Sequence, residues 1–174
     1  MPTNNTSSLT GRTALVTGGA GGLGRAIALE LHACGAHVAI ADIDKDGAAA
    51  TAAACGERAE AVWMDVSDPE SVRAAVEDLA AAHGASFDLL VNNAGTDRGA
   101  PVVDVTDDAW HTVFGVNLHG PMYTSRAFLR HVLGLPDGQR PRGVADILNI
   151  VSISALTVGG GAGAYNSPRP PCSS

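Results

Sequence analysis

Short runs of apolar residues alternate along the chain with longer segments whose apolar positions recur at helical spacing. The short runs predict buried strands, and the longer, often Ala-rich segments predict helices. In chain order, the pattern predicts strands at residues 13–17, 37–41, 60–64, 87–91 and 145–151, and helices at residues 23–34, 44–55, 69–83 and 107–132. Strands that alternate with helices are typical of β-α-β units and a parallel sheet. Because these strands are apolar almost throughout, we expect helices on both faces of the sheet.

Two prolines mark positions within the predicted helices. Pro69 follows Asp68, which is a good N-cap residue, so the two indicate the start of a helix. Pro121 lies inside the long helical pattern, where it should kink the helix or occupy an early turn. We expect residues 1–12 to form a polar tail, residues 13–167 an incomplete nucleotide-binding domain, and residues 168–174 an aberrant Pro-rich tail.

The composition excludes several classes of function. The chain has 174 residues and a formal net charge of −7, so it suits one globular domain and not a nucleic-acid partner. Its three Cys and six His show no metal-ligand spacing, and the polar N-terminus contains no signal-peptide core. We therefore expect no metal site, no membrane segment and a reduced, cytoplasmic chain.

A glycine-rich turn follows the first predicted strand and opens the first helix. Residues 17–24 read TGGAGGLG, a composition that allows a tight turn and close approach of backbone to a pyrophosphate. Asp42 ends the second strand, eighteen residues past Gly24, where a carboxylate accepts from adenosine ribose hydroxyls. Asp42 could instead cap the next helix, but Asp44 is also placed to do so.

Five matches in chain order resemble the short-chain dehydrogenase/reductase family. Residues 17–24 resemble its TGxxxGxG motif, and residues 92–95 (NNAG) resemble the motif after its fourth strand. The other matches lie at a strand end, in the long helix or in the segment after the fifth strand. They are Asp65, Val66, Asn117, Ser152 and Tyr165. Singly, each match has a structural alternative as a loop cap, a turn residue or a packed side chain. Their joint order and spacing favour the functional interpretation.

The resemblance implies a Rossmann-type doubly wound α/β fold with strand order 3-2-1-4-5, whose last strands are missing. It implies an oxidoreductase that transfers hydride between NAD and a secondary alcohol or ketone. The implied cofactor-binding residues are Thr17, Gly18, Gly22, Leu23, Gly24, Asp42, Asp65, Val66, Asn92, Ala94 and Gly95. The implied catalytic residues are Asn117, Ser152 and Tyr165. The full-length family form is expected to be a homo-oligomer that acts on a small molecule.

The resemblance also implies a role for each catalytic residue. Tyr165 would be the general acid/base, Ser152 would hydrogen-bond the substrate oxygen, and Asn117 would hold a water that relays protons. A free phenol, with a pKa of about 10, is a poor acid/base near neutral pH. The family corrects this with a lysine four residues after the tyrosine, and that lysine also holds the nicotinamide ribose.

The chain departs from the family at that lysine. Arg169 stands four residues after Tyr165, and Lys45, the only lysine, follows the second strand at the adenine end. An arginine keeps the positive charge, but its planar fork does not replace a compact ammonium. Three prolines among residues 168–171 also oppose the helix expected here. We therefore expect an intact cofactor half and a damaged catalytic half.

A shifted reading frame would explain the whole tail. Residues 168–173 (PRPPCS) can be encoded as CCA AGG CCG CCG TGC TCN. One G restored before these letters gives GCC AAG GCC GCC GTG CTC, which encodes Ala-Lys-Ala-Ala-Val-Leu and places a lysine four residues after Tyr165. The alternative is a genuine Pro-rich terminus.

Three hypotheses for the function stay open from the sequence. The chain is an NAD-dependent short-chain dehydrogenase, a catalytically dead nucleotide-binding remnant, or a fragment that does not fold alone. NAD is expected over NADP because the carboxylate of Asp42 would repel a 2′-phosphate, and residues 18–24 contain no cation.

Overall fold

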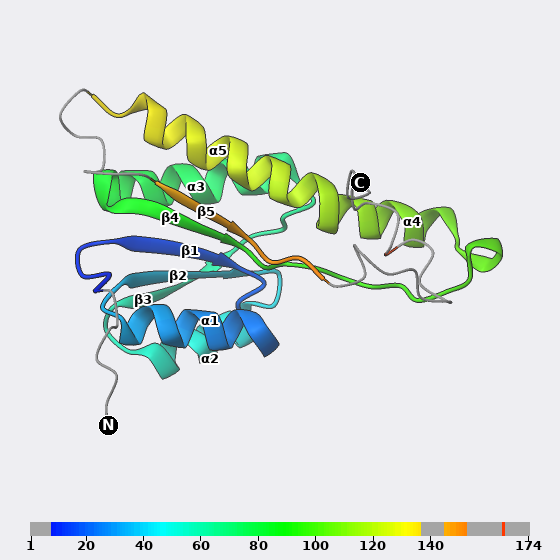
Figure 1. Ribbon diagram of the computed structural model, residues 1–174, viewed down its shortest axis with the longest axis horizontal. Coiled ribbons are helices and arrows are strands. Elements are labelled where there is room, and N and C mark those ends of the chain that lie inside the picture. The colour runs from blue at the N-terminus through cyan, green and yellow to red at the C-terminus, as the bar shows by residue number, and fades with distance from the viewer. Residues whose placement is uncertain (1–7, 137–144, 153–164, 166–174) are drawn as a thin grey trace, which may run out of the picture.

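The computed structural model describes residues 8–136, 145–152 and 165, and its strands form one parallel sheet (Figure 1). The strands are β1 (Thr13–Thr17), β2 (His37–Asp42), β3 (Ala59–Trp63), β4 (Phe87–Asn92) and β5 (Asp146–Asn149). The helices are α1 (Gly22–Ala33), α2 (Lys45–Cys55), α3 (Pro69–His83), α4 (Asp107–Phe114) and α5 (Gly120–Gly134). Short helical segments are η1 (Gly84–Ser86), η2 (Val102–Asp104) and η3 (Gly115–His119). Apart from the long helix and the fifth strand, each element begins and ends within one residue of its predicted bounds.

The strand order is β3-β2-β1-β4-β5, and every neighbouring pair is parallel. Figure 1 shows α1 and α2 on one face of the sheet and α3 and α5 on the other. Successive strand residues therefore enter different cores. Leu15 and Ala39 pack on the side of α3 and α5, whereas Val16 and Ile40 pack on the side of α1 and α2. This two-sided burial explains the uninterrupted apolar runs and confirms the doubly wound α/β fold.

The fifth strand is shorter than the run of residues 145–151 predicts. Its last residue, Asn149, pairs with Asn92, which is the last residue of β4. One further backbone hydrogen bond joins the Ile150 amide to the Asn92 carbonyl at 2.9 Å. The length of β4, and not the apolar pattern of the fifth run, thus sets where β5 ends.

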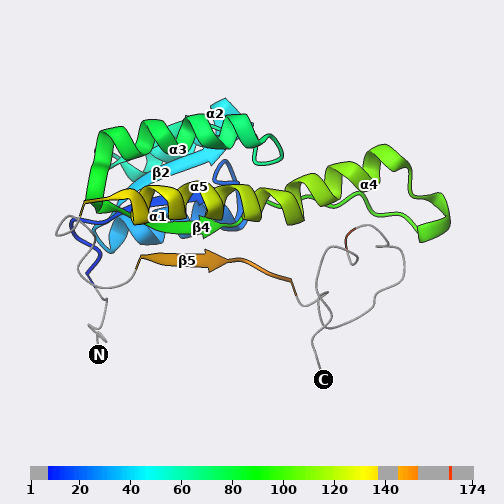
Figure 2. The ribbon, with the colours of Figure 1, turned by 90° about the horizontal axis from the view of Figure 1, so that it is seen from above.

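The predicted helix at residues 107–132 changes its geometry near the middle. α4 ends at Phe114, η3 follows as a π-helix, and α5 begins at Gly120 with Pro121 in its first turn. Pro121 has no amide hydrogen, and its ring crowds the carbonyl four residues earlier. A π-helical turn pairs residues five apart and widens the helix there. The early-turn alternative for Pro121 is therefore confirmed, and α4 continues past the sheet (Figure 2).

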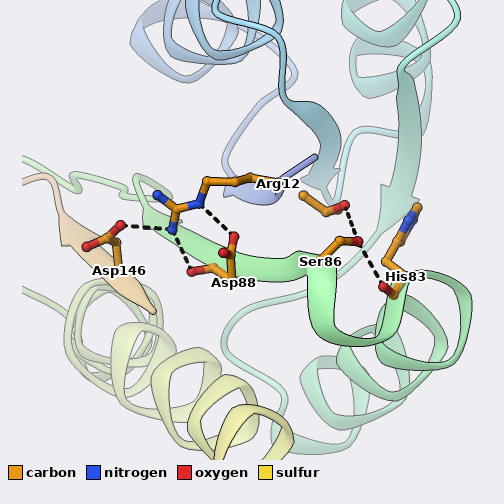
Figure 3. A network of polar contacts seen from close by, with 6 residues as sticks. Arg12, His83, Ser86, Asp88 and Asp146 are labelled. Atoms are coloured by element: carbon orange, nitrogen blue, oxygen red, sulfur yellow. Dashed lines mark hydrogen bonds and ion pairs between the residues drawn. The ribbon is translucent and has the colours of Figure 1, made fainter. Parts of the chain in front are cut away.

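A partly buried arginine joins three strands at the amino end of the sheet (Figure 3). The Arg12 guanidinium donates to Asp88 Oδ1 at 2.8 Å and pairs with Asp146 Oδ2 at 2.8 Å. Burial raises the pKa of the Asp88 carboxyl, and the hydrogen bond from Arg12 opposes that shift. Burial tends to lower the pKa of Arg12, but its hydrogen bonds to both carboxylates raise it above the ordinary value. Arg12 therefore stays charged and neutralises two strand residues.

The polar tail expected at residues 1–12 is folded at its end. Leu9 packs against the core on the side of α1 and α2, and its amide donates to the Cys34 carbonyl at 2.8 Å. Arg12 forms ion pairs with Asp88 and Asp146 at the amino end of the sheet. One apolar residue and one partly buried charge thus hold this segment against the fold. Among the helices of the described residues, none has the length and apolar character needed to cross a membrane.

Candidate cofactor and active site

The candidate site lies at the carboxyl edge of the sheet. The chain leaves β1 toward β2 on one side and later returns to β4 on the other, so the two connections diverge between β1 and β4. In open α/β sheets, ligands bind in the crevice at such a switch point. The glycine-rich turn at residues 17–24 and the NNAG segment at residues 92–95 follow these two central strands.

Close packing explains the glycines of the first turn. Gly18 and Gly22 have φ angles of +66° and +53°, in the region that glycine adopts without strain. A Cβ at Gly24 would lie 2.1 Å from the Gly18 carbonyl oxygen and 2.5 Å from Asn93 Nδ2. Helix α1 therefore begins directly against the turn, and no side chain caps its first amides. These amides and the helix dipole favour an anion such as a pyrophosphate.

Asp42 ends β2 beside this turn. Its carboxylate accepts hydrogen bonds from the backbone amides of Ala20 and Asp44, each at 3.0 Å. Asp44 caps α2 by accepting from the Gly47 amide at 3.1 Å. Asp44 therefore fills the cap, and Asp42 faces a cavity with acceptor sites beyond its two hydrogen bonds.

That cavity has a volume of about 440 Å³ and extends from the glycine turn to the end of β3. Asp65 and Val66 line it at the β3 end. Asp65 also orders its own loop, because one of its carboxylate oxygens accepts from the Ser67 amide at 2.9 Å and hydroxyl at 2.7 Å. The structural alternative for Asp65 is thus observed, and the residue still borders the cavity.

Two predicted binding residues, Thr17 and Asn92, form hydrogen bonds with neighbouring elements. Thr17 is buried, and its hydroxyl accepts from the amides of Asn93 and Ala94, each at 3.0 Å. The Asn92 side chain donates to Asn149 Oδ1 at 2.8 Å and accepts from the Thr124 hydroxyl at 2.6 Å. These bonds show both side chains positioning the strand ends. Direct contact of either with a cofactor stays a prediction.

Asn93 has a role that the sequence pattern does not indicate. Its side-chain amide donates to the carbonyls of Thr17 and Gly18 at 3.0 and 3.1 Å. It thereby ties the end of β4 to the glycine turn. The signal in the sequence is the second Asn of NNAG, but the local pattern does not identify its partners, which are backbone carbonyls of the glycine turn.

Asn117 lies in the π-helical segment η3 and faces the loop after β4. Its side chain accepts from the Thr96 amide and donates to the Thr96 carbonyl, both at 2.8 Å. The pair of bonds holds the segment after Gly95 against the long helix. π-helical turns recur at functional sites, and this one places Asn117 in the site.

A second cavity of about 680 Å³ adjoins the first. Its lining brings together the three predicted catalytic residues, Asn117, Ser152 and Tyr165. Both cavities are lined by Leu23 and by residues 93–96, so they meet over the NNAG segment. The carboxyl edge thus joins a compartment next to Asp42 with a compartment next to the candidate catalytic groups.

Two cations of the described residues bear on the site, one that the sequence analysis did not single out and one that lies where it was expected. Arg98 lines the first cavity and was not singled out in the sequence. Lys45 begins α2 and places its ammonium 5.5 Å from the centre of the Trp63 ring, on the β3 side. This agrees with the expectation that Lys45 does not replace the missing lysine. Arg169 lies outside the described residues.

The fold, the glycine turn and the paired cavities are features of a Rossmann-type dinucleotide-binding protein. The family model for short chain dehydrogenases matches residues 12–168, and the chain belongs to that family. Members of the family are oxidoreductases.

Individual relatives agree with this membership. The short chain dehydrogenase/reductase dpchG of Colletotrichum higginsianum is 39% identical over 170 residues, covering 95% of this chain and 61% of that protein. Sorbitol dehydrogenase of Cereibacter sphaeroides is 42% identical over 125 residues, which cover 72% of this chain and 48% of that protein. The crystal structure of a short chain dehydrogenase/reductase from Burkholderia phymatum in complex with NAD matches with a TM-score of 0.84 at 30% identity. The match covers 93% of this chain and 56% of that protein. The chain spans 48% to 61% of the length of these relatives.

Proposed function

We propose that the chain binds NAD and supplies the cofactor half of an oxidoreductase acting on a secondary alcohol or ketone. The observation that supports this most is the pair of adjoining cavities. One contains the glycine turn and Asp42, and the other contains Ser152 and Tyr165. The names of sorbitol dehydrogenase and of the NAD complex from Burkholderia phymatum agree with this substrate class and cofactor.

The residues present fit a dinucleotide. Nothing lies within 4 Å of a Cβ built at Gly21 or Gly22, so the backbone of the turn is open to a phosphate group there. The uncapped amides at the start of α1 would donate to the pyrophosphate. Asp42 would accept from the adenosine ribose, and Asp65 and Val66 would border the adenine ring at the end of β3.

The chemistry requires a hydride carrier and control of one proton. The nicotinamide, when bound, exchanges the hydride with the substrate carbon. Tyr165 would exchange the proton of the substrate oxygen, and Ser152 would hydrogen-bond the same oxygen. Asn117, which is fixed by Thr96, would hold the water of the proton relay.

The preference for NAD over NADP belongs to the proposal and rests on Asp42. Its carboxylate is held at the end of β2 by two backbone amides, so it cannot turn away without losing both hydrogen bonds. A 2′-phosphate on the ribose would meet this negative charge. Arg98 is the cation in the lining of the same cavity, and it is the residue to test if NADP binds as well.

Cofactor binding and turnover are separable in this proposal. The residues of the first cavity all lie before residue 117, whereas the lysine expected after Tyr165 is replaced by Arg169. The chain would then bind NAD and turn over little or no substrate. A catalytically inactive nucleotide-binding protein is the second candidate function, and the exchange at Arg169 is the observation that favours it.

The homo-oligomer and the cytoplasmic location are further parts of the proposal. An apolar groove on α5, next to β5, exposes Met122, Leu129 and Leu133. Such a face suits contact with a second subunit of the family form. The location rests on cysteine usage, since Cys34 and Cys55 are both free thiols.

One experiment separates the two candidate functions. The present chain and a chain with the reading frame restored after Ser167 are assayed for NADH formation with a panel of secondary alcohols and polyols. The proposal expects NAD binding by both chains and turnover by the restored chain alone. Tyr165→Phe in the restored chain should abolish turnover and leave NAD binding intact. Turnover at equal rates by both chains would contradict the assigned role of the lysine.

A further inference from the structure

Two histidines and a glutamate meet at the amino end of the sheet, on the opposite edge from the cofactor site. His37 begins β2, Glu60 lies in β3, and His83 is the last residue of α3. All three side chains are partly exposed, with exposed fractions of 28%, 40% and 17%. The cluster has no part in the cavities described above.

The alternation of side chains along the strands explains why these groups meet. Ala39 pairs with Glu60 across β2 and β3, so their side chains share one face of the sheet. His37 lies two residues before Ala39 and therefore projects to the same face. Ala39 belongs to the core beneath α3. Helix α3 ends on this face, and its terminal His83 completes the cluster.

The three groups already have the spacing of metal ligands. Glu60 Oε1 lies 3.1 Å from His37 Nε2 and 2.6 Å from His83 Nε2. The two imidazole rings are tilted by 44°, with centroids 4.5 Å apart. One ligand atom from each residue lies within 4.8 Å of the other two. A zinc ion with bonds of about 2.0–2.2 Å needs tetrahedral ligands roughly 3.3 Å apart, so shifts under about 1 Å would open a site.

We propose that His37, Glu60 and His83 bind a divalent cation of the zinc class, with water in the remaining position. Two imidazoles and a carboxylate are a ligand set that zinc accepts, and the partial exposure leaves an entry path for the ion. The C-terminal end of the fifteen-residue α3 lies at the site, and its dipole favours a cation there. The ion would join β2, β3 and α3 and stabilise the fold by mass action.

The sequence did not reveal this cluster. Each histidine is 23 residues from Glu60, far outside the short spacings by which metal motifs are found. Only the parallel register of β2 and β3, together with the length of α3, brings the three groups together. The rival interpretation is a carboxylate that accepts hydrogen bonds from two imidazoles and binds no ion.

The test is a zinc titration of the tag-free, 174-residue chain after treatment with a chelator, followed by calorimetry. We expect one bound Zn²⁺ per chain. His37→Ala, Glu60→Gln and His83→Ala should each weaken the affinity by about tenfold or more, which is the loss that even an outer-shell change can cause. His32→Ala and Cys34→Ser are the matched controls and should bind Zn²⁺ as the unchanged chain does.

A second readout covers the folding of the variants. In chelator, the thermal transition of each variant shows whether it is folded. Added Zn²⁺ should raise the transition of the unchanged chain and of both controls, but not that of the three variants. Glu60→Gln keeps the size of the side chain, so it decides the question if a histidine variant does not fold. No binding by the unchanged chain, an unchanged Zn²⁺ affinity in Glu60→Gln, or loss of binding in Cys34→Ser would overturn the proposal.

Discussion

Alanine at position 24 tests whether the glycine turn is built for a phosphate. The new Cβ would lie 2.1 Å from the Gly18 carbonyl oxygen, whereas carbon and oxygen ordinarily approach to about 3.3 Å. The turn or the start of α1 must therefore shift by roughly 1 Å. Asn93 would shift as well, because its amide lies 2.5 Å from the new atom and donates to Thr17 and Gly18.

The energy of this substitution follows from three contributions. Overpacking costs about 1–3 kcal/mol. Loss of one hydrogen bond of Asn93 adds about 1 kcal/mol. Replacement of a helical glycine by alanine stabilises the helix by about 1 kcal/mol, which offsets part of this loss. We expect Gly24→Ala to lower the free energy of unfolding by about 2 kcal/mol, and the displaced amides to weaken NAD binding by about tenfold or more, which is at least 1.4 kcal/mol.

Gly134→Ala is the matched control at a helical glycine away from the two cavities. Gly134 ends α5, and nothing lies within 4 Å of a Cβ built there. Because Gly134 lines neither the first nor the second cavity, we expect the affinity for NAD to stay unchanged. Both variants are titrated with NAD at a temperature where circular dichroism shows them folded, and their stabilities are measured in urea. Unchanged NAD affinity and an unchanged free energy of unfolding for Gly24→Ala would show that the close packing at Gly24 does not position the phosphate-binding amides.

Three further predictions concern other parts of the molecule. Asp42→Ala should narrow the difference between the dissociation constants of NAD and NADP, and an unchanged ratio would show that Asp42 does not select the cofactor. Arg12→Met should lower the free energy of unfolding, measured in urea, by about 3 kcal/mol, because the buried carboxylate of Asp88 then lacks its cation. Burial raises the pKa of Asp88, and a raised carboxyl pKa favours the protonated folded form, so this loss should shrink as the pH falls through that pKa. A loss that grows toward low pH would contradict this sign. The genomic DNA after codon 167 should continue in another frame into a helix with a lysine four residues after Tyr165; if neither other frame does so, the tail is genuine.

The parts of the fold that the sequence predicted well are those buried on both sides. β1 is entirely buried and β4 likewise, so their apolar runs and their bounds agree closely. The end of β5 depends on where β4 ends, and this cannot be read from the fifth run itself. Pro121 signalled a local change in the long helix, but the π-helical solution depends on how the neighbouring carbonyls are accommodated.

The candidate site was predictable because parallel strands present their carboxyl ends at one edge. Residues that follow β1, β2, β3 and β4 must therefore gather there, whatever their distance along the chain. The division of labour among them was not predictable. Asn92 and Asn93 are adjacent in sequence, yet one joins β4 to α5 and β5 while the other holds the glycine turn. Arg98 and the cluster around Glu60 depend on contacts between distant elements, which no local pattern encodes.

NAD binding in the first cavity is the step on which the other parts of the proposed function depend. Its most direct test is an equilibrium titration of the purified 174-residue chain with NAD and with NADP, followed by calorimetry on protein that shows a cooperative thermal transition. We predict saturable binding of NAD, weaker binding of NADP and a rise of the transition temperature with NAD concentration. A folded chain that shows no saturable binding of either nucleotide would mean that this cavity is not a dinucleotide site.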